Sequence, residues 1–208
     1  EERRRFDRLL IEQHYLRSAV LVGEALRYVA VDGERWLALL AWSTAAFKCG
    51  PRDAWIGWPA RLQWRRLPLI VNNARFLVLP EARQPHLASR VLCLACRRLS
   101  RDWQAAFRHP ILLAETFVES GRFTGTCYRA AGWTPLGETR GYGRSGGSYY
   151  RHGVRKLVLV KPLHREVRRL LCDPLPHPEW SDQEQGMDSL ALNLVGPGSL
   201  SEALENVL

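Results

Sequence analysis

The sequence predicts an α/β protein in which a mixed, mostly antiparallel sheet flanked by helices forms a single domain with a C-terminal tail. Three observations predict this class. The 208 residues are 46% hydrophobic, which is enough for one domain with its own core. Helical and strand-like patterns are interspersed along residues 1–171. Residues 25–31 and 35–43 read as two strands flanking Asp32 and Gly33, a strong signal for an antiparallel hairpin.

The first half of the chain contains three further segments with a distinct pattern. Residues 3–16 place apolar side chains at helical spacing and predict an amphipathic helix. Residues 51–68 mix tryptophan and arginine and are expected to be irregular. Residues 69–79 predict a central strand interrupted by two asparagines, and a long helix with an arginine-rich outer face is expected at about 85–107.

The second half begins with an apolar run at residues 109–119, which predicts a strand buried on both faces. The remaining predicted elements are a short helix at 124–132, a strand at 133–141, a glycine-rich loop, a strand at 155–163 and a helix at 164–171. Gly141, Gly143 and Gly146 form a G-x-G-x-x-G pattern, but a dinucleotide fingerprint has to open a helix. Here the pattern leads into a strand, and it therefore predicts a flexible loop.

The composition changes at Cys172. Residues 172–198 are acidic and proline-rich and predict a linker, whereas residues 199–208 have the apolar spacing of the start of a downstream helix. All 30 basic residues lie within residues 1–170, where 14 acids oppose them. The first residue is not Met, and we expect the chain to be cut from a longer protein.

The positive charge is almost entirely arginine, since Lys48, Lys156 and Lys161 are the only lysines. A guanidinium group binds phosphate bidentately and stacks on bases. The composition therefore favours nucleic acid, and DNA in particular, as the partner. The alternative is an arginine-rich, well-solvated surface with no such role.

The five cysteines are an odd number in a domain large enough to need no disulfide, which predicts a reducing, cytoplasmic location. The sequence shows no secretory signal and no apolar run of about 20 residues, so no membrane contact is expected. Cys93 and Cys96 form a single C-x-x-C pair. Because structural zinc needs about four ligands, the pair predicts buried helix residues, and no metal site is expected.

Guanidinium and indole groups are interleaved in residues 52–66, a combination suited to phosphates and to unstacked bases. The alternative is that these tryptophans pack under the sheet. The nucleic-acid contacts predicted here and farther along the chain are Arg52, Trp55, Trp58, Arg61, Arg65, Arg66, Arg75, Arg122, Arg129, Arg140 and Arg144.

A second group of candidates lies in the predicted sheet. Asn72 and Asn73 interrupt an apolar strand, and buried amides destabilise a protein unless they are hydrogen-bonded. The doublet predicts a bulge where the strand diverges from its neighbour, either as a ligand site or as a satisfied structural feature. Tyr128 is expected near the ends of the strands that begin at Leu69 and Ile111. There it either donates a proton to a leaving group or packs in the core.

Two stretches resemble the GNAT acetyltransferase superfamily. In that superfamily a strand ends in a pyrophosphate-binding turn at the start of a long helix, as residues 75–92 do here. A later helix carries a tyrosine four residues before a Gly-aromatic pair, as Tyr128 precedes Gly132 and Trp133 here. The resemblance implies an acetyltransferase-like arrangement of the sheet.

The same resemblance implies acetyl-CoA as the cofactor and Tyr128 as the general acid, with Asn73 or Glu115 orienting or deprotonating the nucleophile. The cofactor-binding residues that it implies are Arg83, Leu87, Ala88 and Ser89. The turn departs from the superfamily's pattern at Pro85 and His86, where a glycine and free backbone N–H groups are needed.

A closer resemblance covers nearly the whole basic region, in segments whose order is specific. The segments are HYL (14–16), RDAWIGW (52–58), IVNNARFLVLP (70–80), LAS (87–89), DW (102–103), ETFVE (115–119), GTCYRAAGW (125–133) and LGETRGYGR (136–144). They resemble the DruA family of the Druantia anti-phage defence system, whose relatives are also found as N-terminal extensions of DDE-type transposases. The resemblance implies a context of phage defence or mobile DNA, with a fused or associated transposase or a defence helicase as protein partner.

Three functions follow as hypotheses. The first is a nucleic-acid-binding module with an acetyltransferase-like fold and a degenerate cofactor turn. The second is an acyl- or group-transferase that modifies a nucleobase or a protein amine, with Tyr128 as the acid. The third is a docking domain for a downstream partner, which would present apolar patches rather than arginines at its contact.

Overall fold

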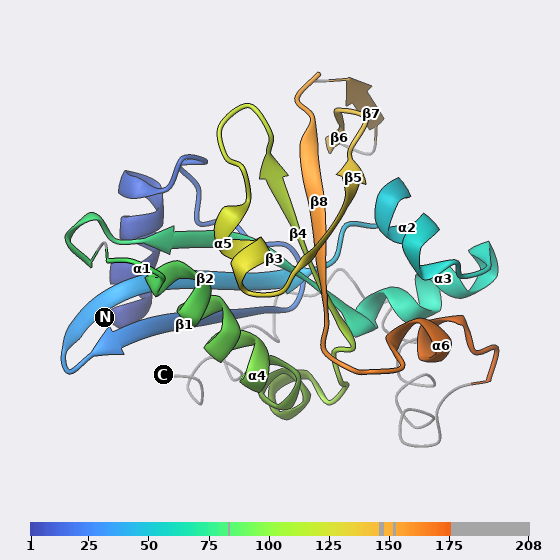
Figure 1. The fold of residues 1–208 in the computed structure, drawn as a ribbon, viewed down its shortest axis with the longest axis horizontal. Coiled ribbons are helices and arrows are strands. Elements are labelled where there is room, and N and C mark those ends of the chain that lie inside the picture. Colours follow the sequence, from blue (N-terminus) through green and yellow to red (C-terminus); the bar gives the residue numbers. More distant parts are fainter. Residues whose placement is uncertain (83, 146–147, 152, 176–208) are drawn as a thin grey trace.

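The computed structural model describes residues 1–82, 84–145, 148–151 and 153–175, and at 142–145 and 148–151 only the backbone. Its centre is a six-stranded sheet in the order β1-β2-β3-β4-β8-β5 (Figure 1). The strands are β1 (Ala25–Asp32), β2 (Arg35–Thr44), β3 (Ile70–Val78), β4 (Leu113–Glu119), β5 (Thr134–Glu138) and β8 (Lys156–Pro162). β3 and β4 run parallel, and the other neighbouring pairs run antiparallel. The predicted mixed, mostly antiparallel sheet is confirmed.

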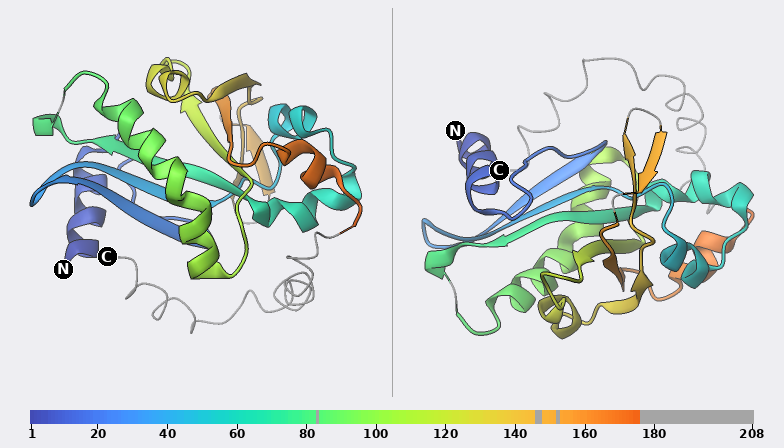
Figure 2. Two further views of the ribbon diagram at one scale, coloured as in Figure 1. Left: turned by 60° about the horizontal axis from the view of Figure 1, so that its bottom comes forward. Right: turned by 90° about the horizontal axis from the view of Figure 1, so that it is seen from above.

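Helices lie on both faces of this sheet. They are α1 (Glu2–Gln13), α2 (Gly50–Ile56), α3 (Ala60–Arg66), α4 (Leu87–Phe107), α5 (Thr126–Ala130) and α6 (Val167–Cys172), with short 3-10 turns η1 (Leu67–Leu69) and η2 (Pro80–Ala82). α1 covers one face, α4 and α5 cover the other, and α2, α3 and α6 lie together at one end (Figure 2). That end has its own apolar cluster, in which Ile56 and Trp58 pack with Leu170 and Leu171.

The hairpin predicted from Asp32 and Gly33 is confirmed, with Asp32 paired to Arg35 across the turn. The bulge predicted at the asparagine doublet is confirmed as well. Ala41 pairs with Arg75 and the next residue, Trp42, pairs with Asn73, so one residue of β3 is unpaired against β2. An extra residue of this kind bends a strand and turns a side chain toward a new partner.

β3 also diverges from β4 at this point. The parallel ladder runs from Ile70 to Asn72 on β3 and from Leu113 to Glu115 on β4, and it ends there although both strands continue. Figure 1 shows the two strands separating beyond the ladder, with α5 in front of the place where they separate. The sequence prediction that the strand leaves its neighbour at the doublet is therefore confirmed.

The prediction of an irregular segment at residues 51–68 is wrong, because this stretch forms α2 and α3. Pro51 lies in the first turn of α2 and Pro59 is the N-cap of α3, positions that tolerate the missing N–H of proline. Gly57 ends α2 at φ 79°, a left-handed conformation that glycine adopts without strain. Two helices of seven residues each are too short for a hydrophobic period to be recognised from sequence.

The prediction of a flexible loop at the G-x-G-x-x-G pattern is also wrong in part. β6 (Tyr142–Ser145) and β7 (Ser148–Arg151) pair as a separate two-stranded sheet, while Gly146 lies outside the described residues. Gly141 has φ 74°, and a Cβ there would lie 2.9 Å from the backbone of Gly153. The glycine therefore permits a close approach of two backbones at the base of this hairpin.

The domain boundary predicted at residue 171 falls within α6, which ends at Cys172. The following residues pack back on the domain, because the guanidinium of Arg66 donates to the backbone carbonyls of Asp173 and Leu175 at 3.1 and 3.2 Å. The rest of the expected linker and the expected helix at 199–208 lie outside the described residues. Among the helices described, none is long and apolar enough to cross a membrane.

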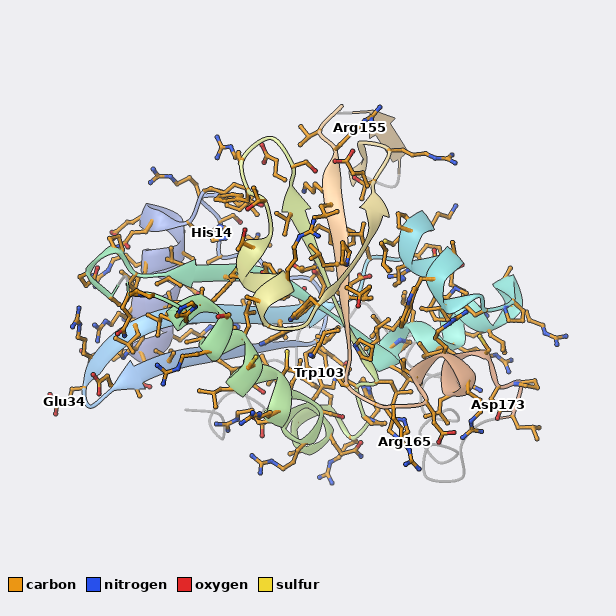
Figure 3. The ribbon with its side chains drawn as sticks, in the orientation of Figure 1. His14, Glu34, Trp103, Arg155, Arg165 and Asp173 are labelled. Carbon is orange, nitrogen blue, oxygen red and sulfur yellow. The ribbon has the colours of Figure 1, made fainter. Side chains whose placement is uncertain are left out.

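His14 lies just after α1 (Figure 3). Its ionisation makes the stability of the fold depend on pH. Its ring is buried, and Nδ1 accepts a hydrogen bond from the Leu16 N–H at 3.2 Å. Burial, helped by the charge of Arg75, lowers the pKa of His14 from 6.5 to about 4. Below pH 6.5 the unfolded chain therefore binds a proton that the native ring does not, and stability falls as the pH drops toward about 4.

We accordingly expect the urea midpoint to be lower at pH 5 than at pH 7, and a His14→Gln variant to lose part of that difference. His164→Gln, at an exposed histidine, is the matched control and should keep the full pH dependence. An unchanged pH dependence in His14→Gln would show that the neutral ring of His14 does not contribute to it.

Candidate nucleic-acid interface

Tyr128, the residue expected to act as an acid, lies in α5 with its side chain buried. Its hydroxyl donates a hydrogen bond of 2.7 Å to Oδ1 of Asn73. Its ring packs edge-on against Phe76 and Trp133, at centroid distances of 6.1 and 5.1 Å. Burial raises the pKa of Tyr128, so the phenol holds its proton firmly. A tyrosine so enclosed has its polar atom satisfied within the protein.

Asn73 has its polar groups satisfied as well. Its Nδ2 donates to the carbonyl oxygens of Ala41 and Arg75 at 3.4 and 3.3 Å, and Oδ1 accepts from Tyr128. The hydroxyl of Thr116, on β4, donates to the Asn73 carbonyl at 3.1 Å. These bonds join β3, β4 and α5 where the two strands diverge. For Asn73 the bonds favour the alternative of a satisfied structural bulge, whereas Oδ1 of Asn72 is buried without a hydrogen-bond partner among the described residues.

Glu115 lies on the opposite face of β4 from this group. Successive side chains of a strand point to opposite faces, and it is Thr116 that contacts Asn73. The Glu115 carboxylate instead accepts from Arg52 at 2.9 Å and from the Ala46 N–H at 2.8 Å. The three residues proposed for catalysis therefore do not converge on one point: Tyr128 and Asn73 meet, and Glu115 lies apart.

Arg52 is the centre of a buried ion-pair network. Besides Glu115, its guanidinium pairs with Asp53 at 2.8 Å and donates to the carbonyl of Ala46 at 2.7 Å. Burial acts to lower the pKa of Arg52, but the carboxylates of Glu115 and Asp53 outweigh it, and the pKa lies above its usual value. The network fastens α2 to β4 and to the chain that follows β2.

The turn expected to hold acetyl-CoA has some of its polar groups engaged within the protein. Arg83 lies outside the described residues. The Leu87 N–H already donates to the Gln84 carbonyl at 3.3 Å, and the Ser89 hydroxyl donates to the His86 carbonyl at 3.0 Å. Pro85 has no N–H, and a pyrophosphate site at a helix start depends on free N–H groups. Leu87, Ala88 and Ser89 form the first turn of α4, and their role in cofactor binding stays a prediction.

The residues predicted to contact nucleic acid fall into a buried group and a more exposed group. Arg52 and Arg66 are 0% and 2% exposed and Trp58 is 9% exposed, so these three cannot reach a phosphate or a base. The prediction is wrong for these three residues, because their side chains are buried inside the protein at this end of the sheet. Arg61 and Arg65 are exposed on α3, next to Trp64 at 44% exposure.

The remaining predicted arginines are scattered. Arg75 is half-buried and donates to the carbonyls of Ser18 and Val20, which fastens the chain after α1 to β3. Arg122 pairs with Glu119 at 3.4 Å and lies over the ring of Tyr15. Arg129 is exposed on α5, Arg140 is exposed in the loop between β5 and β6, and the side chain of Arg144 is not among those that the structure describes.

The fold adds arginines that the sequence prediction missed. α6 packs beside α2 and α3, and it places the Arg168 guanidinium 5.7 Å from the ring centre of Trp55. Arg65 lies 5.5 Å from the ring centre of Trp64 in the same way. The signal for α6 was available, since Arg165, Arg168 and Arg169 follow a helical spacing opposite buried Val167, Leu170 and Leu171. We call Trp55, Arg61, Trp64, Arg65, Arg165 and Arg168 the α3–α6 surface.

The fold and these contacts define a class of protein. It is an α/β domain in which the central Tyr128 is buried and hydrogen-bonded to Asn73, and in which arginine side chains stack on tryptophan at the end formed by α2, α3 and α6. The chain belongs to the family described as Druantia protein DruA, whose sequence pattern matches residues 1–150. The resemblance found from the sequence is confirmed. A comparison with curated proteins gives no match.

Among solved structures, the chain is similar to an acetyltransferase from Bacillus subtilis in complex with CoA, with 9% identity and a TM-score of 0.44, over 67% of this chain and 78% of that one. It is also similar to a spermidine N-acetyltransferase from Vibrio cholerae, with 7% identity and a TM-score of 0.44, over 78% of this chain and 74% of that one. Both are named as acetyltransferases. The likeness is partial, and we take no residue role from it.

Proposed function

We propose that this DruA-family domain binds nucleic acid, DNA in particular, through the α3–α6 surface, as part of an anti-phage defence or transposon-associated protein. The observation that supports this most is the stacking of exposed or half-exposed indoles with guanidinium groups from two separate segments, Arg65 on Trp64 and Arg168 on Trp55. Indole faces accept unstacked bases, and guanidinium groups accept phosphates.

The charges of the α3–α6 surface support the same proposal. Within the part of the chain that the structure describes, Arg61, Arg65 and Arg168 have no carboxylate at ion-pair distance. The nearby acid Glu166 is paired with Arg169 at 2.9 Å. The surface therefore presents guanidinium charge that the protein itself does not neutralise, which favours an anionic partner.

The group-transferase alternative has less support. It required Tyr128, Asn73 and Glu115 to surround a reacting atom, whereas Tyr128 and Asn73 bond to each other and Glu115 faces α2. A general acid has to reach the atom that it protonates. The bonds at the centre of the sheet favour a structural role for this tyrosine, and the proposal accordingly assigns the function to the surface.

The test is the salt dependence of binding to a single-stranded DNA of about 20 nucleotides, measured by fluorescence anisotropy. The wild-type affinity should fall steeply between about 50 and 200 mM salt, because each neutralised phosphate releases counterions. The Arg61→Gln/Arg65→Gln double variant should bind more weakly, and the slope of log affinity against log salt should shrink by about one to two.

The matched control is Arg4→Gln/Arg8→Gln, which removes the same charge from exposed positions of α1. It should change the salt slope much less than the α3 variant does. Equal losses in both double variants would show that net charge, and not the α3–α6 surface, binds the DNA. The absence of any salt-dependent binding by the wild-type domain would overturn the proposal.

A further inference from the structure

α4 carries a row of arginines along its outer face. Arg90, Arg97 and Arg101 are exposed, and at 100° per residue they lie within about 40° of one another around the helix axis. At about 1.5 Å per residue, Arg90 and Arg101 are roughly 16 Å apart along that axis. Arg108, also exposed, follows at the C-cap. We call these four residues the α4 stripe.

The α4 stripe is held in place by the opposite face of the helix. The buried side chains of that face, which pack into the main core of the domain, are Leu87, Val91, Leu92, Ala95, Leu99 and Trp103. The positions of the guanidinium groups are therefore set by a rigid element of the fold rather than by a loop. A row of this kind suits a regular array of anions.

Most of this charge is not neutralised by the protein. Asp102 is the one acid within α4, and it is engaged by Tyr28, Arg98 and Arg101. Across the described chain, Arg90 and Arg97 have no carboxylate within ion-pair distance. These two arginines lie two helical turns apart and are the strongest phosphate contacts that the stripe offers.

The α4 stripe differs in chemistry from the α3–α6 surface. The aromatic residues of α4 are Trp103, which is buried, and Phe107, which is half-buried, and the exposed apolar neighbour of the arginines is Leu94. The stripe can therefore contact phosphates but has no exposed ring on which a base could stack. Contacts of this kind suit duplex DNA, whose bases are already stacked and whose backbone is regular.

α4, which carries the stripe, and α6, which carries Arg168 of the α3–α6 surface, lie on the same side of the sheet. α4 and α6 both face the viewer in the left view of Figure 2. Figure 3 shows Arg165 between α6 and the end of α4 that carries Trp103. Arg165 and α6 therefore offer a nucleic acid a route from the α4 stripe toward the α3–α6 surface.

We propose that the domain recognises a junction of double-stranded and single-stranded DNA, with the duplex backbone on the α4 stripe and the unpaired strand on the α3–α6 surface. This inference rests on the proposed function, because it takes the α3–α6 surface as the single-strand site. It adds a second binding surface and specifies the class of DNA substrate. Joining two sites on one molecule of DNA raises the affinity beyond that of either site alone.

The experiment compares three DNA probes in anisotropy titrations with the domain: a single strand, a blunt duplex of about 20 base pairs, and that duplex with a single-stranded extension at either end. For the wild type, the extended duplex should bind at least about tenfold more tightly than the better of the other two. Arg90→Gln/Arg97→Gln should weaken the duplex and the junction about tenfold and leave the single strand unchanged. Arg61→Gln/Arg65→Gln should weaken the single strand and the junction and leave the blunt duplex unchanged.

Circular dichroism verifies that each variant is folded, and Arg4→Gln/Arg8→Gln again controls for net charge. A junction that binds no more tightly than the better simple probe would overturn the inference. So would an Arg90→Gln/Arg97→Gln variant that weakens all three probes equally. Either result would leave the proposed function standing if the single strand still binds through α3, whereas the failure of every probe to bind would remove both.

Discussion

Replacement of Arg52 by methionine should lower the free energy of unfolding by about 3–5 kcal/mol, the cost expected when one partner of a buried ion pair is removed. Arg52 and Glu115 are both 0% exposed, and their nitrogen and oxygen atoms lie 2.9 Å apart. Without the guanidinium, the Glu115 carboxylate stays buried with the Ala46 N–H as its remaining donor. Urea unfolding followed by circular dichroism measures the loss.

The double variant Arg52→Met/Glu115→Met provides the control. Since it removes both charges, it should recover most of the stability that Arg52→Met loses, because an apolar pair of similar volume can replace a buried ion pair at little cost. Arg61→Met, at an exposed arginine of α3, should stay within about 0.5 kcal/mol of the wild type. A double variant no more stable than Arg52→Met would show that Glu115 is not what makes the single substitution costly.

Trp42→Ala is expected to have a similarly large effect, about 3–5 kcal/mol of lost stability. Trp42 is 0% exposed on β2, directly opposite Asn73, and its ring stacks on Trp133 with centroids 6.4 Å apart and planes 17° from parallel. Its removal would open a cavity beside the group that holds α5 on the sheet. Thermal and urea unfolding measure the effect.

Trp64→Ala is the matched control, because Trp64 is 44% exposed and stacks on Arg65. Its effect on stability should stay within about 0.5 kcal/mol. Its effect on single-stranded DNA binding should be a loss of about 1–3 kcal/mol, as expected when a base loses its stacking partner. If Trp64→Ala unfolds the domain as Trp42→Ala does, Trp64 is part of the core and the α3–α6 surface loses its exposed ring.

Both pairs of variants compare a buried side chain with an exposed one, a distinction that the sequence left open. Trp58 and Trp64 belong to the same segment of alternating tryptophan and arginine, yet Trp58 packs in the apolar cluster of α2 and α6 while Trp64 is exposed. Arg52 and Arg61 differ in the same way. Residue type predicted that this segment carries guanidinium and indole groups, but it could not say which of them face solvent. That depends on elements distant in sequence, namely α6 for Trp58 and β4 for Arg52.

Features that depend on neighbouring residues were predictable. Asp32 and Gly33 specify a hairpin because a tight turn needs residues that tolerate its backbone angles. The apolar spacing of residues 87–107 specifies a helix, since burial of one face stabilises it. The bulge at the asparagine doublet was predictable because a buried amide such as that of Asn73 needs hydrogen bonds that a regular ladder leaves unmade.

By itself, the sequence determined the fold class, the family, the arginine excess of residues 1–170 and the position of the bulge. The tertiary structure alone decided that Tyr128 bonds to Asn73 while Glu115 points to the opposite face of β4. It also decided that Arg52 and Arg66 are buried and that Arg168 joins Trp55. The physical reason is that periodicity and turn chemistry act between near neighbours, whereas burial and pairing are set by elements brought together from distant parts of the chain.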